Sequence, residues 1–157
     1  MAERVSGSFR DPSGFLYTQG GTLYRQVNRA YQAQYDRLMD SGLYAAAVKS
    51  GLLIAHQEVD VKPAAPELAY KVIQPERVPF ISYPYEWSFS QLKDAALVTL
   101  ALLRKALDFN MVLKDASAYN IQFHKGRATL IDTLSFDMYE EGSPWVAYRQ
   151  FCQHFLA

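Results

Sequence analysis

The sequence predicts an α+β protein in which a small antiparallel sheet with one crossing helix precedes a mainly helical region. Three observations predict it: short β-rich runs fill the first 83 residues, a long helical segment begins near residue 88, and a hairpin pattern follows that segment. We therefore expect a small sheet-and-helix part over residues 1–83, and a hinge, a long helix and a hairpin over residues 84–157.

The first part should consist mainly of short β-strands. Alternating apolar and polar residues predict strands at Val5–Phe9, Gly14–Thr18 and Thr22–Val27, which the turn sequences RDPSG and QGG would join into an antiparallel sheet. Two later β-rich runs, LLIAHQEV at 52–59 and AYKVIQPE at 69–76, predict two more strands. Together these segments form the expected sheet.

A helical segment lies between the third and fourth predicted strands. Tyr31 and Tyr35 have helical spacing, and Asn28 stands where a capping side chain is expected. A Ser-Gly pair at 41–42 should interrupt this helix, and a second helical stretch follows over 43–49.

The second part should begin with an extended, proline-containing stretch, PFISYPYEW at 79–87, and then a long helix. Ser88 followed by Gln91 is a capping-box pattern, which marks the helix start. Apolar residues recur at helical spacing beyond it and predict one buried stripe, formed by Leu92, Ala96, Leu100, Leu103 and Leu107. After the helix, the runs MVL, NIQF and ATLID predict short strands, with the turn of a hairpin at 124–126.

The composition excludes several classes of protein. Sixteen basic residues balance sixteen acidic ones, so the chain lacks the broad positive charge of a nonspecific nucleic-acid or anionic-membrane binder. The longest apolar stretch, Ala95–Leu103, is too short to span a bilayer. With a single cysteine, Cys152, the chain is typical of a reducing compartment, and we expect a cytoplasmic location. Three scattered histidines show no zinc-ligand spacing, namely His56, His124 and His154.

The C-terminal segment PWVAYRQFCQHFLA has helical periodicity at Trp145, Tyr148, Phe151 and Phe155. Two interpretations are open. The aromatic stripe is either exposed in this chain and covered by residues beyond Ala157, or it belongs to an amphipathic last helix that packs on the core.

Three oxygen-bearing side chains form a pattern that indicates a catalytic and metal-binding loop. Asp115 precedes Asn120 by five positions, and Asp132 follows twelve positions later, across the predicted hairpin. Such a loop can place one carboxylate near an attacking hydroxyl while an amide and a second carboxylate hold Mg²⁺ against ATP phosphates. The alternative is local: Asp and Asn side chains often cap the backbone of their own turns.

This pattern of DxxxxN, a hairpin and then an Asp resembles the catalytic and metal-binding segments of kinase-fold proteins, particularly aminoglycoside-phosphotransferase-like ones. The order of strands and helices agrees. The resemblance implies a kinase-like fold with a truncated helical lobe, in which Asp115 is the catalytic base and Asn120 and Asp132 are the metal ligands.

The same resemblance assigns nucleotide-binding roles. PYEW, with Tyr85 and Glu86, would be the hinge beside an adenine, and RDPSG, with Ser13 and Gly14, would face the phosphates. Arg25 stands in place of the family's strand-three lysine and would clamp a phosphate; a salt bridge on the strand face is the alternative. The acidic residues that could orient it lie in the following helix, at positions 36 and 40.

The segments GSFRDPSGF, LYRQVN, PFISYPYEWSFSQLKDAAL, LKDASAYNIQF and PWVAYRQFCQHFLA resemble the N-terminal region of bacterial proteins classed as SAM-dependent methyltransferases, some of them nodulation-associated. The resemblance implies a class I methyltransferase domain beyond residue 157, where S-adenosylmethionine would bind. Residues 1–157 lack a strand followed by a Gly-rich cofactor loop and should not methylate alone.

Three functions follow as hypotheses. The first is an accessory or recognition region of a methyltransferase-class protein that retains a cleft for ATP with Mg²⁺ or another phosphate, and whose partner is the C-terminal domain of the same chain. The second is an active ATP- and Mg²⁺-dependent phosphotransferase acting on a small hydroxylated substrate. The third is an interaction domain with an inactive cleft.

Overall fold

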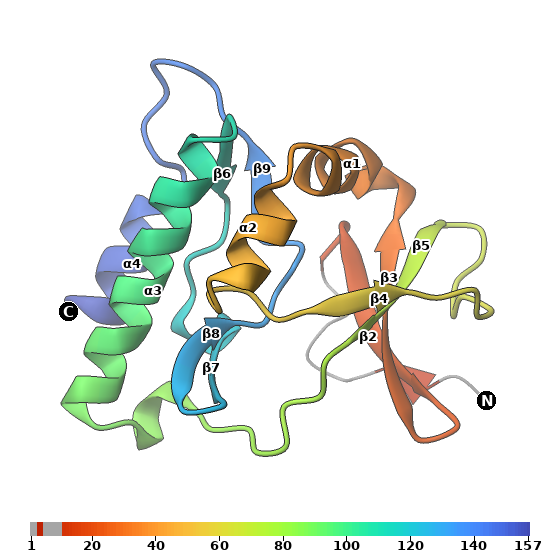
Figure 1. Ribbon diagram of the computed structural model, residues 1–157, viewed down its shortest axis with the longest axis horizontal. Coiled ribbons are helices and arrows are strands. Elements are labelled where there is room, and N and C mark those ends of the chain that lie inside the picture. The colour runs from red at the N-terminus through yellow and green to blue at the C-terminus, as the bar shows by residue number, and fades with distance from the viewer. Residues whose placement is uncertain (1–2, 5–10) are drawn as a thin grey trace. The chain divides into compact units, whose positions relative to one another are not determined.

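The structure is a computed structural model, and it describes residues 3–4 and 11–157. The chain divides into two compact units (Figure 1): a first unit of residues 1–36 and 55–77, and a second unit of residues 37–54 and 78–157. The predicted strand at Val5–Phe9 lies outside the described residues. Among the described helices, none is long and apolar enough to cross a membrane.

An antiparallel sheet forms the first unit. Its strands lie in the order β1-β2-β3-β5-β4, and their bounds are Glu3–Arg4 for β1, Gly14–Gln19 for β2, Thr22–Asn28 for β3, His56–Glu58 for β4 and Ala69–Pro75 for β5. The strands predicted at 14–18, 22–27 and 69–76 are therefore confirmed, whereas of the run predicted at 52–59 only His56–Glu58 forms a strand. A small cluster of apolar side chains packs on the sheet, formed by Phe15, Tyr17, Ala65 and Val72.

The helical segment after β3 consists of a 3₁₀ turn, η1 (Arg29–Tyr31), and the helices α1 (Gln32–Asp40) and α2 (Leu43–Lys49). The predicted interruption is confirmed: Gly42 has a φ of 87°, in the left-handed region that a side chain disfavours.

The predicted capping role of Asn28 is wrong. Its side chain accepts a hydrogen bond from the Gln26 Nε2 (2.8 Å) and donates one to the Pro12 carbonyl (3.0 Å). The buried Gln26 amide also exchanges two hydrogen bonds with the backbone of Ala65, at 3.0 and 2.9 Å. Asn28 is thus part of a buried amide network, which satisfies polar groups that burial would otherwise penalise.

The second part of the second unit, residues 78–157, contains a tight turn that is followed by the longest helix. The stretch predicted to be wholly extended contains a 3₁₀ turn, η2 (Pro84–Glu86), because a proline fits the first position of a helical turn, where no amide hydrogen is needed. The helix α3 (Phe89–Leu107) follows, and its capping box is confirmed: the Gln91 amide donates to the Ser88 Oγ (3.3 Å), and the Ser88 amide donates to the Gln91 Oε1 (2.9 Å).

Short strands and a last helix complete the second unit. The predicted hairpin is confirmed, and its turn residues Lys125 and Gly126 both have positive φ. A strand that the sequence did not predict, β9, pairs with β6. The elements are β6 (Met111–Leu113), η3 (Ala118–Asn120), β7 (Ile121–His124), β8 (Arg127–Leu130), β9 (Phe136–Met138) and α4 (Tyr148–Phe155).

The buried face of α3 differs from the predicted stripe. The side chains that are fully buried belong to Ala95, Thr99, Leu102 and Ala106. Of the predicted residues, Leu100 and Leu107 are each 41% exposed, and the others are partly buried. A row of mostly small residues lets α3 pack closely on the rest of the unit, so the larger leucines lie on the flank.

The last helix packs on the core, which supports the second interpretation of the C-terminal segment. Phe151 and Phe155 are buried within the same cluster as the α3 residues, and Trp145 packs against it, whereas Tyr148 is exposed. α4 lies beside α3 (Figure 1).

The different burial of two leucines on α3 gives a test. Leu102→Ala should destabilise the protein by about 3 kcal/mol because it leaves a cavity, whereas Leu100→Ala should cost less than about 1 kcal/mol because its side chain is half exposed. Urea denaturation of both variants measures the free energies of unfolding. The reverse order would mean that the stripe predicted from the sequence is the buried one.

Candidate functional site

The loop after β6 holds Asp115 in a defined conformation. The Asp115 Oδ1 accepts a hydrogen bond from the Ser117 amide (2.9 Å), and the Ser117 Oγ accepts one from the Tyr119 amide (3.2 Å). These two turns carry the chain from β6 into η3, which ends at Asn120. The local capping that was expected as an alternative is therefore present at Asp115.

The hairpin brings Asn120 and Asp132 to neighbouring positions. The Ile131 amide donates to the Asn120 carbonyl (2.8 Å), which extends the β7–β8 pairing by one residue at its open end. Asp132 is the next residue, and its Oδ1 accepts a hydrogen bond from the Leu134 amide (2.9 Å). Within the described part of the chain, the buried Asn120 Nδ2 has no hydrogen-bond partner. An amide NH₂ group left unsatisfied by its own protein is a donor available to an acceptor atom of a ligand.

Side chains at and before α4 hold the backbone of the loop. They reach the backbone of three residues between 113 and 118, so the loop conformation depends on the position of the helix. The hydrogen bonds run from the Trp145 Nε1 to the Leu113 carbonyl (2.7 Å), from the Ala116 amide to the Gln150 Oε1 (2.7 Å) and from the Ala118 amide to the His154 Nδ1 (3.2 Å). We call these three side chains the loop clamp.

The donor set around the hairpin fits Mg²⁺ better than a metal held wholly by protein. Magnesium prefers oxygen ligands and usually takes one or two from the protein, with water and phosphate completing its coordination. The Asp132 carboxylate and the Asn120 Oδ1 are oxygens of the kind that Mg²⁺ prefers. Among the described residues, no group of three or more His, Cys, Asp or Glu side chains could hold a metal ion, so a closed zinc-type cage is not formed by them.

The predicted hinge residues Tyr85 and Glu86 lie in η2. The Glu86 carboxylate accepts a hydrogen bond from the Tyr83 amide (2.7 Å), and the Tyr83 and Tyr85 rings stack with centroids 5.5 Å apart. Partial desolvation, followed by the charge of Glu86, raises the pKa of Tyr85, and Tyr119 of η3 contributes to the same shift.

A buried amide fixes the hinge segment to β7. The Gln122 side chain accepts from the Ser82 amide (2.9 Å) and donates to the Ser82 carbonyl (2.9 Å). The Trp87 Nε1 donates to the Ser82 Oγ (2.9 Å), and the Trp87 ring packs edge-on against Phe123. Because Gln122 is two residues from Asn120, one short strand positions both the hinge and a candidate metal ligand.

The remaining predicted residues, Ser13, Gly14 and Arg25, lie in the first unit. Asp11 joins two of them: its Oδ1 accepts from the Ser13 amide (2.8 Å), and its Oδ2 lies 3.9 Å from the Arg25 Nη2. Gly14 begins β2, and its amide donates to the Asp11 carbonyl (3.3 Å). Among the described residues, Arg25 pairs with Asp11, which was not expected, and not with the acidic residues of the following helix at positions 36 and 40. A phosphate at Arg25 would compete with the Asp11 carboxylate.

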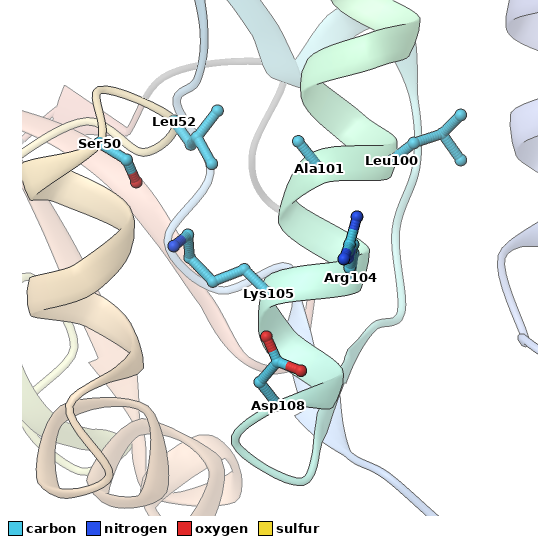
Figure 2. Close-up of a pocket in the computed structure, with 7 residues that line it drawn as sticks. All are labelled: Ser50, Leu52, Leu100, Ala101, Arg104, Lys105 and Asp108. Atoms are coloured by element: carbon cyan, nitrogen blue, oxygen red, sulfur yellow. The ribbon is translucent and has the colours of Figure 1, made fainter.

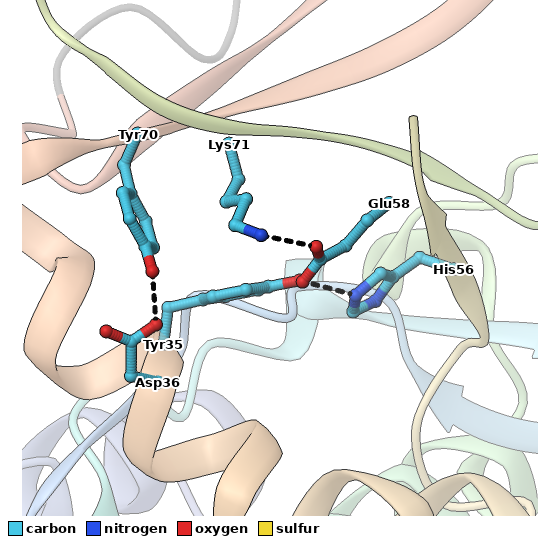
Figure 3. A network of polar contacts seen from close by, with 6 residues as sticks. All are labelled: Tyr35, Asp36, His56, Glu58, Tyr70 and Lys71. Atoms are coloured by element: carbon cyan, nitrogen blue, oxygen red, sulfur yellow. Dashed lines mark hydrogen bonds and ion pairs between the residues drawn. The ribbon is translucent and has the colours of Figure 1, made fainter. Parts of the chain in front are cut away.

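A second polar cluster in the first unit ties α1 to the sheet (Figure 3). The Tyr35 hydroxyl donates to the Glu58 Oε1 (3.1 Å) and lies 3.0 Å from the His56 Nε2, which therefore acts as a donor. The other pairs are the Lys71 Nζ with the Glu58 Oε2 (2.6 Å) and the Tyr70 hydroxyl with the Asp36 Oδ1 (2.7 Å). Asp36 is therefore engaged by a tyrosine.

These contacts shift the pKa values of their members. Burial lowers the pKa of His56 to about 4, against the opposing effect of the Glu58 carboxylate. The hydrogen bond from Lys71 lowers the pKa of Glu58, and the same bond raises the pKa of Lys71. The cluster thus keeps an ionised pair beside a neutral imidazole.

A shallow pocket of about 480 Å³ lies elsewhere on the second unit, against α3 (Figure 2). It is lined by Ser50, Leu52, Leu100, Ala101, Arg104, Lys105 and Asp108. None of the side chains predicted for catalysis or nucleotide binding lines it, so it is separate from the candidate site.

Comparisons with known proteins show what this chain resembles. No protein-family model matches the chain. The chain is 38% identical over 160 residues to nodulation protein NoeA of Rhizobium meliloti strain 1021; the match covers 98% of this chain and 32% of that protein. The chain thus spans about a third of the length of this curated relative.

A solved structure of vaccinia related kinase 3 matches with a TM-score of 0.50, over 88% of this chain and 48% of that chain. The fold is kinase-like. At 13% identity this similarity shows the fold alone. The predicted α+β kinase-like fold is confirmed, and so is the resemblance to a nodulation-associated protein; a methyltransferase activity stays a prediction.

Sequence reasoning missed the residues that position the site. Asp11, Gln122 and the loop clamp were not singled out, and His154 was assigned no chemistry. One signal existed: Gln150 and His154 are four residues apart, so they share one face of the amphipathic last helix. Two polar side chains on the same face of an amphipathic helix indicate hydrogen-bond partners elsewhere in the protein, but only the tertiary structure shows that these partners are the loop amides.

The loop clamp gives a matched test on one helix. Gln150→Ala leaves the Ala116 amide without its acceptor, which should cost about 1–2 kcal/mol and speed hydrogen exchange of that amide. Gln153→Ala, at an exposed position of α4, should change stability by less than about 0.5 kcal/mol. Equal exchange of the Ala116 amide in both variants would contradict the clamp.

His56 gives a pH dependence. The folded protein keeps His56 neutral down to about pH 4, whereas the unfolded chain protonates it below its ordinary pKa of 6.5. Its contribution to stability is therefore complete above pH 6.5 and is lost as the pH falls toward 4, by on the order of 2 kcal/mol. The same loss in His56→Gln and wild type, measured by urea denaturation, would exclude His56 as the cause; His124→Gln is the control.

Proposed function

We propose that this chain is a kinase-like region of a longer nodulation-type protein, that it binds a nucleotide with Mg²⁺, and that it assists a methyltransferase domain without transferring methyl groups itself. S-adenosylmethionine would then bind to polypeptide outside residues 1–157. The ligand class follows from the side chains of the second unit, and the accessory role follows from the relation to the longer relative.

The observation that supports nucleotide binding is the position of Asn120 and Asp132 at the open end of the β7–β8 hairpin, where the Ile131 amide donates to the Asn120 carbonyl (2.8 Å) and Asp132 is the next residue. The Asp132 carboxylate and the Asn120 Oδ1 would be the oxygen ligands, and the buried Asn120 Nδ2, which has no hydrogen-bond partner among the described residues, would donate to a phosphate oxygen. Mg²⁺ held there would neutralise phosphate charge and orient the phosphates. The roles of Arg25, Ser13 and Gly14 at phosphate, and of Tyr85 and Glu86 at adenine, belong to the same proposal.

The accessory role is supported by coverage. The match to NoeA includes nearly all of this chain but 32% of that protein, so the greater part of the relative consists of polypeptide that this chain does not contain. A kinase-like region in such a protein can supply recognition while another part performs the chemistry.

A specific observation also favours the rival function, an active phosphotransferase. The loop clamp fixes the backbone on both sides of Asp115, and a general base requires such fixed placement near the attacking hydroxyl. Asp115 would then accept the proton of a small hydroxylated substrate.

Thermal shift with ATP and Mg²⁺ tests the proposal. At a ligand concentration about 100 times the Kd, binding should add about 2.7 kcal/mol to the stability of the wild type. Asn120→Ala and Asp132→Asn should lose most of the Mg²⁺-dependent part, because each removes a metal ligand. Asp94→Asn, at an exposed position on α3, is the control.

The outcomes separate the three functions. If wild type shows no shift with ATP and Mg²⁺, the nucleotide-binding proposal fails and an interaction domain remains. If wild type binds and turns over ATP, and Asp115→Asn binds but does not, the phosphotransferase is supported. Binding without turnover in wild type supports the accessory region.

A further inference from the structure

The helix α3 has a second apolar flank beside its buried face. Leu100, Leu103 and Leu107 recur at intervals of three and four residues, so they lie on one side of the helix. Leu103 is partly buried, while Leu100 and Leu107 are each 41% exposed. This is the stripe that sequence periodicity predicts to be covered, and within this chain it is covered only in part.

The C-terminal end of this flank opens into an apolar groove of about 380 Å³. Its lining residues belong to the end of α3, to the paired strands β6 and β9, and to the segment that joins β9 to α4. Its apolar lining includes Leu103, Leu107, Val112, Met138, Tyr139 and Val146. Several of these side chains are large and exposed, Val146 at 71% and Met138 at 43%. We call it the α3–β9 groove.

The charges at the α3–β9 groove have one sign. Two of its lining residues are charged, Asp137 and Glu140, and both are acidic. An occupant with an apolar side chain and an adjacent lysine or arginine would fill the groove and pair with this edge, whereas an acidic occupant would be repelled.

The relative indicates where such an occupant comes from. The match covers 98% of this chain but 32% of NoeA, so a protein of that kind has a large amount of further polypeptide in covalent attachment to this region. Tethering raises the effective concentration of a segment to about the millimolar range, which favours docking within the chain over capture of a separate partner.

We propose that the α3–β9 groove is the docking site for a segment of the longer polypeptide, outside the part represented by this chain, that inserts an apolar side chain next to a basic residue. The proposal rests on the part of the proposed function that places this chain in a longer protein and is independent of nucleotide binding. The groove is then the contact through which this region and the rest of the protein are joined.

Hydrogen exchange measured on this chain alone and on the longer protein that contains it tests the proposal. Amides of residues 103–107 and 136–146 should exchange at least about tenfold more slowly in the longer protein, whereas amides around Leu68 should exchange alike in both. Leu68 is a suitable reference because its side chain, 48% exposed, lies in the first unit.

Variants identify the contact. Leu107→Lys and, separately, Glu140→Lys should remove the protection in the longer protein while leaving this chain folded when alone, and Leu68→Lys should change neither. Equal exchange at the groove in both proteins would overturn the proposal. Concentration-dependent dimers of this chain that Leu107→Lys abolishes would also overturn it, because the occupant would be a second copy.

The thermal shift with ATP and Mg²⁺, measured on the same proteins, keeps the two proposals distinguishable. Leu107→Lys should leave that shift unchanged. Groove protection without any nucleotide shift would defeat nucleotide binding alone, and a nucleotide shift without groove protection would defeat the docking proposal alone.

Discussion

The loop after β6 depends on hydrogen bonds that its own residues cannot supply. Ala116 and Ala118 are buried, so their amide donors are removed from water and need acceptors within the protein. Gln150 and His154 accept them from α4, and these acceptors are one helical turn apart. The position of α4 therefore sets the conformation of the loop, and with it the position of Asp115. The apolar packing of Phe151 and Phe155 holds α4 in place. The conformation of the candidate catalytic loop therefore depends on the hydrophobic core.

The predicted site residues of the two units differ in how completely the chain satisfies their polar groups. In the second unit, the hairpin fixes Asn120 and Asp132 as neighbours and leaves an amide nitrogen without a partner among the described residues. In the first unit, Arg25 is beside the Asp11 carboxylate, which lowers the net charge available to an anion. Asn120 and Asp132, the predicted metal ligands, are for this reason a firmer basis for a ligand than the predicted phosphate clamp.

The helix α3 shows how one apolar periodicity can serve two surfaces. Its small buried residues pack against the unit, and three of its leucines form a flank that ends at the α3–β9 groove. A helix with apolar residues over such a wide arc is expected to be covered on more than one side. The kinase-like fold and the proposed docking site are thus connected through one element: the same helix that supports β6 and β8 also carries the surface offered to further polypeptide.

The sequence by itself determined most of the helices and strands and their order, the α3 capping box and the hairpin turn, because these depend on residues close together in the chain. It also marked Asp115, Asn120 and Asp132, whose spacing carries local information. Tertiary structure decided the rest: which face of α3 is buried, the pairing of β9 with β6, the amide network that engages Asn28, and the loop clamp. Each of these depends on which distant groups meet, since a buried donor or an apolar face is satisfied by whatever the fold brings to it, and periodicity along the chain does not specify that partner.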